Sequence, residues 1–156
     1  MINLEIVSGG QTGVDRAALD FALQNGIKCS GFCPKGRKAE DGRISSRYPL
    51  TETSSSFYQE RTRLNVIQSD AVLIVFNNEM GRGTEVAIKE AKRYRKPYFI
   101  VNLKEKSGNT VDDVRRWINE NSINKLNVAG PRASSDAGIY EKCLQFLEEV
   151  FGLGIV

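Results

Sequence analysis

The sequence predicts an α/β fold of the Rossmann-like, doubly wound type: a mainly parallel sheet of five or slightly more strands with helices on both faces. Short β-rich segments alternate along the chain with helical patterns, which is typical of βαβ units. One segment, Ala71 to Phe76 (AVLIVF), is continuously apolar, as expected of a strand buried on both faces. The length of 156 residues predicts a single domain, residues 1–156.

The N-terminal part predicts a strand, a glycine-rich turn and a helix, in that order. The strand covers residues 2–7 and runs into Ser8-Gly9-Gly10-Gln11-Thr12-Gly13. Apolar residues then recur at helical spacing until Asn25-Gly26 ends the helix: Val14, Ala17, Ala18, Phe21 and Ala22. A second short strand is predicted from Ile27 to Cys33.

The middle of the chain is irregular. Residues 34–55 show no period of either kind and carry the turn dipeptide Asp41-Gly42, so we expect a functional or disordered loop. Ser56 and Gln59 form a capping-box pattern that predicts a helix to about Gln68.

The C-terminal half repeats the alternation of strands and helices. The strand 71–76 is followed by Gly81-Arg82-Gly83-Thr84 and a helix that ends before Pro97. A strand over 98–103 precedes a helix that Thr110 and Asp113 would cap. The last strand covers 126–129, and a closing helix follows Gly130-Pro131-Arg132 with apolar residues at core spacing: Ile139, Cys143, Phe146, Leu147 and Val150.

Composition excludes several classes of chemistry. The chain has no histidine, so it can hold neither a Ser-His-Asp or Cys-His nucleophile nor a His-ligated zinc, and we predict no metal site. Its three cysteines form no CxxC pair, which favours a reducing, cytoplasmic setting. We expect no secretory signal and no membrane span. The net charge of +3 is too small for a dedicated nucleic-acid binder.

The unusual sequence follows the ends of the predicted strands, where open α/β sheets bind ligands. Gly9-Gly10-Gln11-Thr12-Gly13 and Gly81-Arg82-Gly83-Thr84 each precede a helix, so their backbone amides favour an anion. The alternative for each is a tight turn that binds nothing. Arg82 and Arg132 are candidate partners for phosphate or carboxylate.

Two familiar phosphate motifs are absent. A Walker A loop needs Gly-Lys-Ser/Thr at the start of the helix, but Val14 and Asp15 follow Gly13. The dinucleotide fingerprint needs a glycine at position 8, which is serine, and an acid after the second strand, where Cys33-Pro34-Lys35 stands.

The segment 34–53 carries Lys35, Arg37 and several other charged side chains, which are either ligand contacts or a solvated surface. Arg61 and Asn65, four residues apart on one predicted helix, are candidates to meet that segment. Three carboxylates are candidates for acid or base work: Asp15, Asp41 and Glu85.

Several long strings resemble the molybdenum carrier family, whose members are Rossmann-like relatives of molybdenum cofactor carrier proteins and of LOG-type phosphoribohydrolases. The strings are SGGQTGVDRAALDFA (8–22), CPKGRKAEDGRI (33–44), YPLTET (48–53), RTRLNV (61–66), SDAVLI (69–74) and NVAGPRAS (127–134). The resemblance implies binding roles for four groups of residues. These are the glycine loop (Gly9, Gly10, Gln11, Thr12, Gly13 and Asp15), the charged loop (Lys35, Gly36, Arg37, Glu40, Asp41 and Gly42), Arg61 with Asn65, and Gly130-Pro131-Arg132.

One departure from the LOG-type pattern bears on catalysis. Gly83-Thr84 resembles the phosphate loop of the hydrolases, but these place glutamate three residues after the threonine, where this chain has Ala87. Glu85 is about 200° around the helix from position 87 and cannot replace it.

Three hypotheses follow. The first is a binding protein for a phosphorylated pterin- or nucleotide-like ligand, with molybdenum cofactor (molybdopterin) as the leading candidate and Gln11 and Asn65 as partners of the pterin edge. The second is a hydrolase of nucleotide N-glycosidic or phosphate bonds. The third, a single-stranded nucleic-acid module, has few candidate aromatics: Phe32, Tyr48, Phe57 and Tyr58. The resemblance also implies a homo-oligomer.

Overall fold

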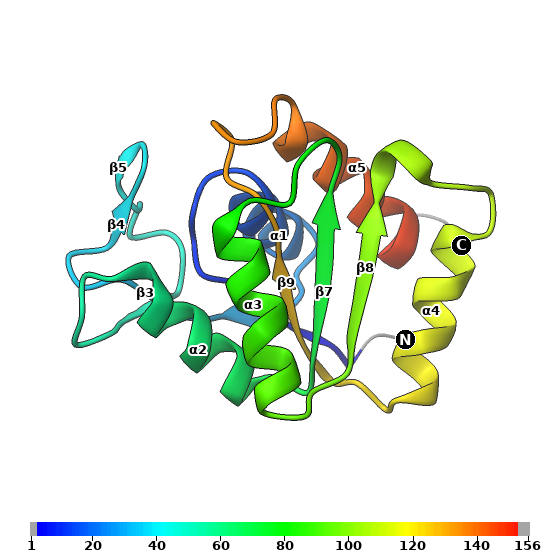
Figure 1. Cartoon of the computed structure of the whole chain (residues 1–156), viewed down its shortest axis with the longest axis horizontal. Coiled ribbons are helices and arrows are strands. Elements are labelled where there is room, and N and C mark those ends of the chain that lie inside the picture. The colour runs from blue at the N-terminus through cyan, green and yellow to red at the C-terminus, as the bar shows by residue number, and fades with distance from the viewer. Residues whose placement is uncertain (1–2, 153–156) are drawn as a thin grey trace.

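The computed structural model describes residues 3–152 and has a central sheet of five strands in the order β2-β1-β9-β7-β8 (Figure 1). The strands are β1 (Glu5–Val7), β2 (Cys29–Ser30), β7 (Ala71–Phe76), β8 (Tyr98–Asn102) and β9 (Lys125–Ala129). Every neighbouring pair is parallel, which confirms the predicted Rossmann-like α/β fold. Residue 2, which the sequence placed in the first strand, lies outside the described residues.

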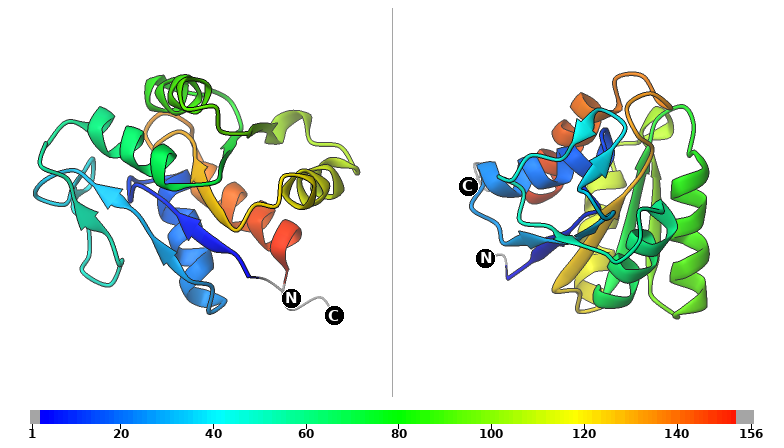
Figure 2. Two further views of the ribbon diagram at one scale, coloured as in Figure 1. Left: turned by 90° about the horizontal axis from the view of Figure 1, so that it is seen from below. Right: turned by 90° about the vertical axis from the view of Figure 1, so that its left-hand side faces the viewer.

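Helices cover both faces of this sheet (Figure 2). One face carries α1 (Val14–Gln24), α4 (Thr110–Glu120) and α5 (Ile139–Phe151), and the other carries α2 (Tyr58–Gln68) and α3 (Arg82–Arg93). Side chains of β7 alternate between the two cores: Leu73 and Val75 pack under the first group, and Val72 and Ile74 under the second. This double burial explains the continuously apolar sequence of β7.

The strand predicted over 27–33 is confirmed only in part, because the segment divides at Gly31. Its first part is β2, and its second part, β3 (Phe32–Cys33), leaves the main sheet to pair with β6 (Thr51–Glu52). A Cβ atom at Gly31 would overlap the carbonyl oxygen of Ser8 in the backbone. This close approach lets the chain turn away from β1.

Residues 34–55 form an ordered loop that includes a small hairpin of β4 (Lys38–Ala39) and β5 (Gly42–Arg43). The buried Arg37 holds it together through hydrogen bonds to four carbonyl oxygens. Its Nε donates to Ile44 (3.0 Å), its Nη1 to Leu50 (3.1 Å), and its Nη2 to Ser45 (2.7 Å) and Tyr48 (2.9 Å). The expectation of a ligand contact for Arg37 is thereby corrected, because the guanidinium is used within the loop.

Both capping boxes predicted from sequence are wrong. The N-cap of α2 is Phe57 and that of α4 is Asn109, and neither side chain bonds the helix. Thr110 instead accepts a 3.0 Å hydrogen bond from the Ser107 amide in the preceding turn. Two strand limits also shift: β9 begins at Lys125, and the short 3-10 helix η1 (Leu103–Glu105) follows β8.

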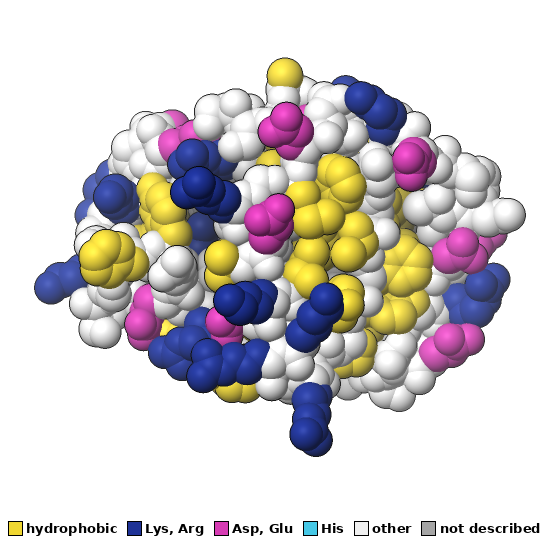
Figure 3. Space-filling model, viewed as in Figure 1, with side chains coloured by type: hydrophobic (Ala, Val, Ile, Leu, Met, Phe, Trp, Pro, Cys, Tyr) yellow, Lys and Arg dark blue, Asp and Glu magenta, His cyan; other side chains and the backbone are white. Residues whose placement is uncertain are grey.

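Strand order fixes where the loops meet. From β1 the chain moves outward to β2, and from β7 it moves outward to β8 on the other side, while β9 fills the centre. The carboxyl ends of β1, β9 and β7 therefore lie together where the order reverses, which is where such sheets bind ligands. On the face toward the viewer in Figure 3, Lys and Arg gather on the side of α2 and α3. No helix within residues 3–152 is long and apolar enough to cross a bilayer.

Candidate functional site

A cleft of about 360 Å³ opens at the carboxyl ends of β1, β9 and β7. Four segments line it: the loop after β1, the first helical turns of α2, the start of α3, and the loop after β9. Thirteen residues singled out from the sequence lie on its wall: Gly9, Gln11, Asp15, Tyr58, Arg61, Asn65, Gly81, Arg82, Gly83, Thr84, Gly130, Pro131 and Arg132. The two glycine loops are thus on one cleft, as expected.

The start of α3 is the part of the cleft best suited to an anion. Gly81 is the N-cap residue, with φ of 78°, so the amides of Arg82, Gly83 and Thr84 lie in the first turn. Within residues 3–152 these three amides have no hydrogen-bond partner. A helix start of this kind offers free N–H donors and the positive end of the dipole.

The side chains at this helix start also suit an anion. Thr84 is 1% exposed, and its Oγ1 has no hydrogen-bond partner within the described part of the chain. Buried hydroxyls are nearly always paired, so this one, on a cleft wall, is available to a water, an ion or a ligand. Arg82 is exposed at the cleft, and a Cβ at Gly83 would meet open space, so the backbone can be approached closely there.

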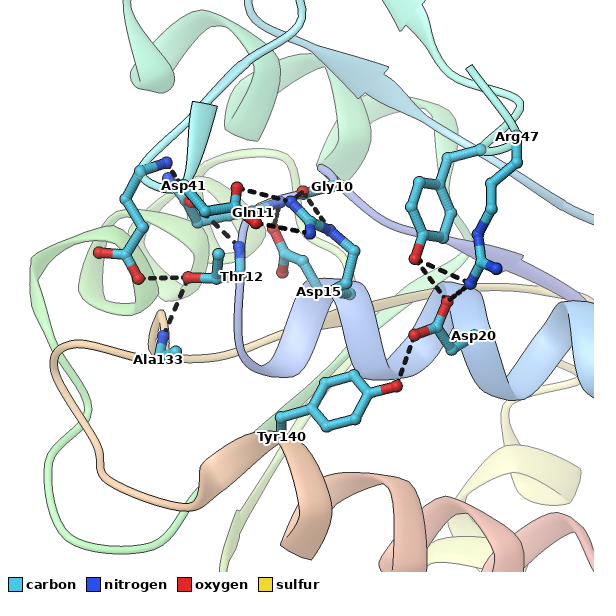
Figure 4. A network of polar contacts seen from close by, with 12 residues as sticks. Gly10, Gln11, Thr12, Asp15, Asp20, Asp41, Arg47, Ala133 and Tyr140 are labelled. Atoms are coloured by element: carbon cyan, nitrogen blue, oxygen red, sulfur yellow. Dashed lines mark hydrogen bonds and ion pairs between the residues drawn. The ribbon is translucent and has the colours of Figure 1, made fainter. Parts of the chain in front are cut away.

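The first glycine loop, predicted to bind an anion, uses much of its hydrogen-bonding capacity within the protein. Three of its five amides are bonded within the protein: Gly10 donates to Ser8 Oγ (3.3 Å), Gln11 to Asp15 Oδ2 (3.3 Å) and Thr12 to Gln11 Oε1 (3.0 Å). The Val14 amide, at the start of α1, donates to the carbonyl of Pro131 (3.3 Å). Figure 4 shows part of this network.

Close packing explains the glycines of this loop. Gly13 has φ of 80°, and a Cβ there would overlap the backbone of Pro131 and Arg132. Gly10 has the same φ, and a Cβ would meet the side chains of Leu50 and Ile44. The loop therefore joins β1 to the loop after β9, and only its edge, at Gly9 and Gln11, faces the cleft.

Arg61 and Asp15 form a nearly buried pair beneath the cleft. Arg61 Nη1 donates a 2.8 Å hydrogen bond to the Gly9 carbonyl and lies 3.5 Å from Asp15 Oδ2. Burial raises the pKa of Asp15, and the nearby Arg61 opposes this only in part. Asp15 is thus the one acid candidate that lies on the cleft wall and has a raised pKa.

Glu40 fastens the charged loop to the loop after β9. It accepts hydrogen bonds from the hydroxyls of Thr12 and Ser134 and lies 3.7 Å from Arg132 Nε. Burial raises the pKa of Glu40, but these hydrogen bonds outweigh burial and leave it below the ordinary value. Thr12 also accepts from the Ala133 amide, so its hydroxyl is used within the protein (Figure 4).

The remaining sequence candidates lie away from the cleft, apart from Tyr58, which lies on its wall. Asp41 pairs with Arg16 at 3.0 Å, and Arg16 also donates to the Gly10 carbonyl. Lys35 and Glu85 are exposed and do not line the cleft. Of the aromatics considered for nucleic acid, Phe57 is 75% exposed, whereas Tyr48 is buried and Tyr58 lies under the Arg61 guanidinium.

Sequence reasoning missed two residues of this region. Asp136 is buried and accepts hydrogen bonds from the amides of Asn77 (2.8 Å) and Asn78 (3.0 Å), which fixes the loop leading to α3. Asn127 is a polar residue in the middle of β9, 3% exposed, and lines the cleft. An amide inside a buried apolar strand was the available signal for Asn127.

The three cysteines lie away from the cleft wall. Burial raises the pKa of all three thiols, which disfavours the reactive thiolate. Among residues 3–152, no group of three or more Cys, Asp or Glu side chains could hold a metal ion.

Comparison with known proteins gives the family. The model of the circularly permuted YpsA SLOG family matches residues 6–151. The chain belongs to this family. A crystal structure of a putative molybdenum carrier protein from Syntrophus aciditrophicus is 39% identical, with a TM-score of 0.87, and the match covers 96% of this chain and 94% of that one. Comparison with curated proteins gives no match.

Family membership agrees with the resemblance found in the sequence and with the Rossmann-like sheet. The strings 8–22 and 127–134 quoted for that resemblance include residues that line the cleft, whereas the string 33–44 lies on the neighbouring loop and contributes none. Within the cleft, the start of α3 presents the amides of residues 82–84 and the Thr84 hydroxyl, none of which bonds another group of residues 3–152.

Proposed function

We propose that this chain is a binding protein that holds a phosphorylated pterin- or nucleotide-like ligand, with the phosphate at the first turn of α3. The observation that carries the proposal is the orphaned hydroxyl of Thr84, beside the unpaired amides of residues 82–84. A phosphate oxygen would accept from this hydroxyl and from the amides together, as anions do at helix starts.

The charges around the cleft support an anionic ligand. Arg82 forms no ion pair with any residue in the described range, so its charge is available. Arg132 is partly offset by Glu40, and Arg61 by Asp15. We therefore assign the main role in neutralising the negative charge of the ligand to Arg82, a secondary role to Arg132, and none to Lys35.

Molybdenum cofactor is the leading ligand within this proposal. The structural neighbour is named a putative molybdenum carrier protein, and the cofactor carries the phosphate that the start of α3 would accept. A cleft of about 360 Å³ is of the size that holds small-molecule ligands. The cofactor brings its own sulfur ligands for the metal, so the protein would hold its pterin and phosphate.

Native mass spectrometry of protein purified gently under anoxia tests the proposal. We expect a bound species with the mass of a phosphorylated pterin, and a loss of most of it in Thr84→Val, which keeps the volume but removes the hydroxyl. Thr51→Val, on the exposed strand β6, is the matched control and should retain the ligand. Ligand-free protein that binds neither inorganic phosphate nor a phosphate ester would refute the proposal.

A nucleotide hydrolase is the second candidate, favoured by the raised pKa of Asp15 on the cleft wall. A carboxyl with a raised pKa is better suited to act as a general acid. Incubation with nucleoside monophosphates, with chromatography for free base and free phosphate, decides between the two. Turnover that disappears in Asp15→Asn supports hydrolysis, and no turnover at high protein concentration removes it.

Partners and location complete the proposal. The three cysteines are free thiols, which suits a reducing, cytoplasmic compartment. Self-association is proposed from the family resemblance alone, and light scattering with size-exclusion chromatography tests it. Binding of single-stranded nucleic acid is disfavoured, since only Phe57 of the aromatic candidates is fully exposed.

A further inference from the structure

Asn127 lies at the floor of the cleft in the centre of the sheet. It is the middle residue of β9, opposite Val7 of β1 and Val72 of β7. Its neighbours Leu126 and Val128 pack into the core under α1 and α5. Since successive residues of a strand face opposite sides, Asn127 faces the side of α2 and α3, where the cleft lies.

Asn127 is only 3% exposed and its side chain forms no hydrogen bond with any residue of 3–152; its polar atoms are not among the fully buried unpaired ones, so they open onto the cleft. A carboxamide carries two N–H donors and an oxygen acceptor, and a ligand or water in the cleft would have to satisfy them. The other buried asparagine on the cleft wall differs: Asn65 bonds both the amide (2.8 Å) and the carbonyl (3.0 Å) of Phe32.

We propose that Asn127 is the base of a subsite for the nitrogen heterocycle of the ligand. Its carboxamide would pair with a ring edge on which a hydrogen-bond donor and an acceptor stand side by side. This inference rests on the proposed phosphate site and assigns the other end of the same ligand. It transfers to Asn127 the role of pterin-edge partner that the sequence gave to Asn65.

The surroundings of Asn127 suit a flat ring. Met80, Ala87, Ala129 and Pro131 line the same cleft and supply apolar contact for the faces of a heterocycle. Gln11 supplies a further donor from the wall. Its Oε1 is held by the amides of Thr12 (3.0 Å) and Glu40 (2.9 Å), so its NH₂ group is left for a ligand.

The pairing defines a chemical class. A carboxamide matches the lactam edge of pterin and of guanine, and equally the amino–imino edge of adenine, because each presents a donor next to an acceptor. A sugar phosphate without a base has no such edge. Asn127 should therefore control how much more tightly the protein binds a nucleotide than a sugar phosphate that lacks the base.

Calorimetric titration with ribose 5-phosphate, adenosine 5′-monophosphate and guanosine 5′-monophosphate tests the inference. In the wild-type protein at least one nucleotide should bind more tightly than ribose 5-phosphate. Asn127→Leu should lower that preference by about tenfold to a hundredfold and leave the affinity for ribose 5-phosphate within about twofold. Thr84→Val should instead weaken binding of all three compounds.

A ligand-free readout accompanies the titration. Leu has the same branching and the same number of side-chain heavy atoms as Asn, and the cleft beside it leaves room for its larger methyl groups, so Asn127→Leu should melt close to the wild-type temperature. If Asn127→Leu does not fold, Asn127→Asp replaces it. A carboxylate repels all three phosphates alike but accepts from both N–H groups of guanine, so the ratio of affinities should shift toward the guanine nucleotide.

The outcomes separate the two proposals. Equal affinity for the three compounds in the wild-type protein, or an unchanged preference in the Asn127 variants, overturns the heterocycle subsite and leaves the phosphate site standing. Failure of every compound to bind, ribose 5-phosphate included, overturns the phosphate site and the subsite with it. If the Asn127 variants lose the preference for a nucleotide but still bind ribose 5-phosphate, both the phosphate site and the heterocycle subsite are supported.

Discussion

The side-chain carboxamide of Asn65 on α2 forms two hydrogen bonds with the backbone of Phe32 on β3. Its Oδ1 accepts from the Phe32 amide at 2.8 Å, and its Nδ2 donates to the Phe32 carbonyl at 3.0 Å. These two hydrogen bonds satisfy the amide and carbonyl of Phe32, as a neighbouring strand would, at the point where the chain leaves the main sheet. Asn65 is therefore a structural residue that also borders the cleft.

Replacing Asn65 should destabilise the fold. Asn65→Ala leaves the amide and carbonyl of Phe32 unpaired, and we expect the free energy of unfolding to fall by about 2–3 kcal/mol. Thermal or denaturant unfolding measures the loss. Asn119→Ala, an exposed asparagine on α4, is the control and should change stability by less than about 0.5 kcal/mol. Equal melting temperatures for the two variants would contradict this role.

The sequence was informative where local pattern and burial agree. The apolar run of β7 and the helical stripe of α1 predicted the layers and the edge of the sheet at which the cleft lies. Gly31 shows the limit: its strand-like neighbourhood predicted one continuous strand, but contact with the Ser8 backbone divides it. That contact joins residues distant in sequence, and no local pattern records it.

The same limit applies to the site. Glycines and flanking residues indicated two helix-start loops, and both reach the cleft. Whether a loop amide is free depends on partners such as Pro131 for Val14, which the sequence cannot specify. For the same reason Arg37 appeared to be a ligand contact, although its donors are used within the loop, and Asn127 was not recognised.

Arg37 should be required for order in residues 34–55 and dispensable for phosphate contact. Arg37→Met removes the hydrogen bonds to four carbonyls while keeping an aliphatic stem, and we expect a loss of about 2–4 kcal/mol. Limited proteolysis should then cut within 34–55 much faster than in the wild-type protein. Arg43→Met, an exposed position on β5, is the control. Unchanged proteolysis in Arg37→Met would contradict the assigned role.

Gly130 should tolerate no side chain. A Cβ at this position would overlap the Val75 carbonyl and the Val14 side chain, which belong to two elements that cannot both move away. We expect Gly130→Ala to lower the free energy of unfolding by about 1–3 kcal/mol. Gly108→Ala, where a Cβ meets open space, should be neutral in the same melting experiment.

Arg82 should contribute to binding without contributing to stability. Its side chain is exposed and makes no ion pair within residues 3–152, so Arg82→Ala should leave the melting temperature unchanged. Affinity for ribose 5-phosphate should fall about tenfold, with a weaker dependence on salt concentration. Lys89→Ala removes a cation from the same helix outside this cleft and is the control. A similar loss in both variants would mean that only general charge matters.

Asp20 should make stability depend on acid pH. This carboxylate accepts from Tyr48 (2.6 Å), Arg47 (2.6 Å) and Tyr140 (2.5 Å), and so joins α1 to the loop 34–55 and to α5 (Figure 4). Burial raises the pKa of Asp20, but these hydrogen bonds outweigh burial and leave it below its ordinary value. The ionised form is thus favoured by folding.

A lowered folded-state pKa gives a definite sign to that dependence. The stabilisation is fully present above the unfolded pKa of about 3.9 and is lost as the pH falls through the lower folded value. Asp20→Asn should therefore cost about 1–3 kcal/mol at pH 7 and progressively less below pH of about 4. Asp112→Asn, on the exposed side of α4, is the matched control. A difference between wild type and Asp20→Asn that stays constant from pH 7 down to the acid transition would contradict the link between Asp20 ionisation and folding.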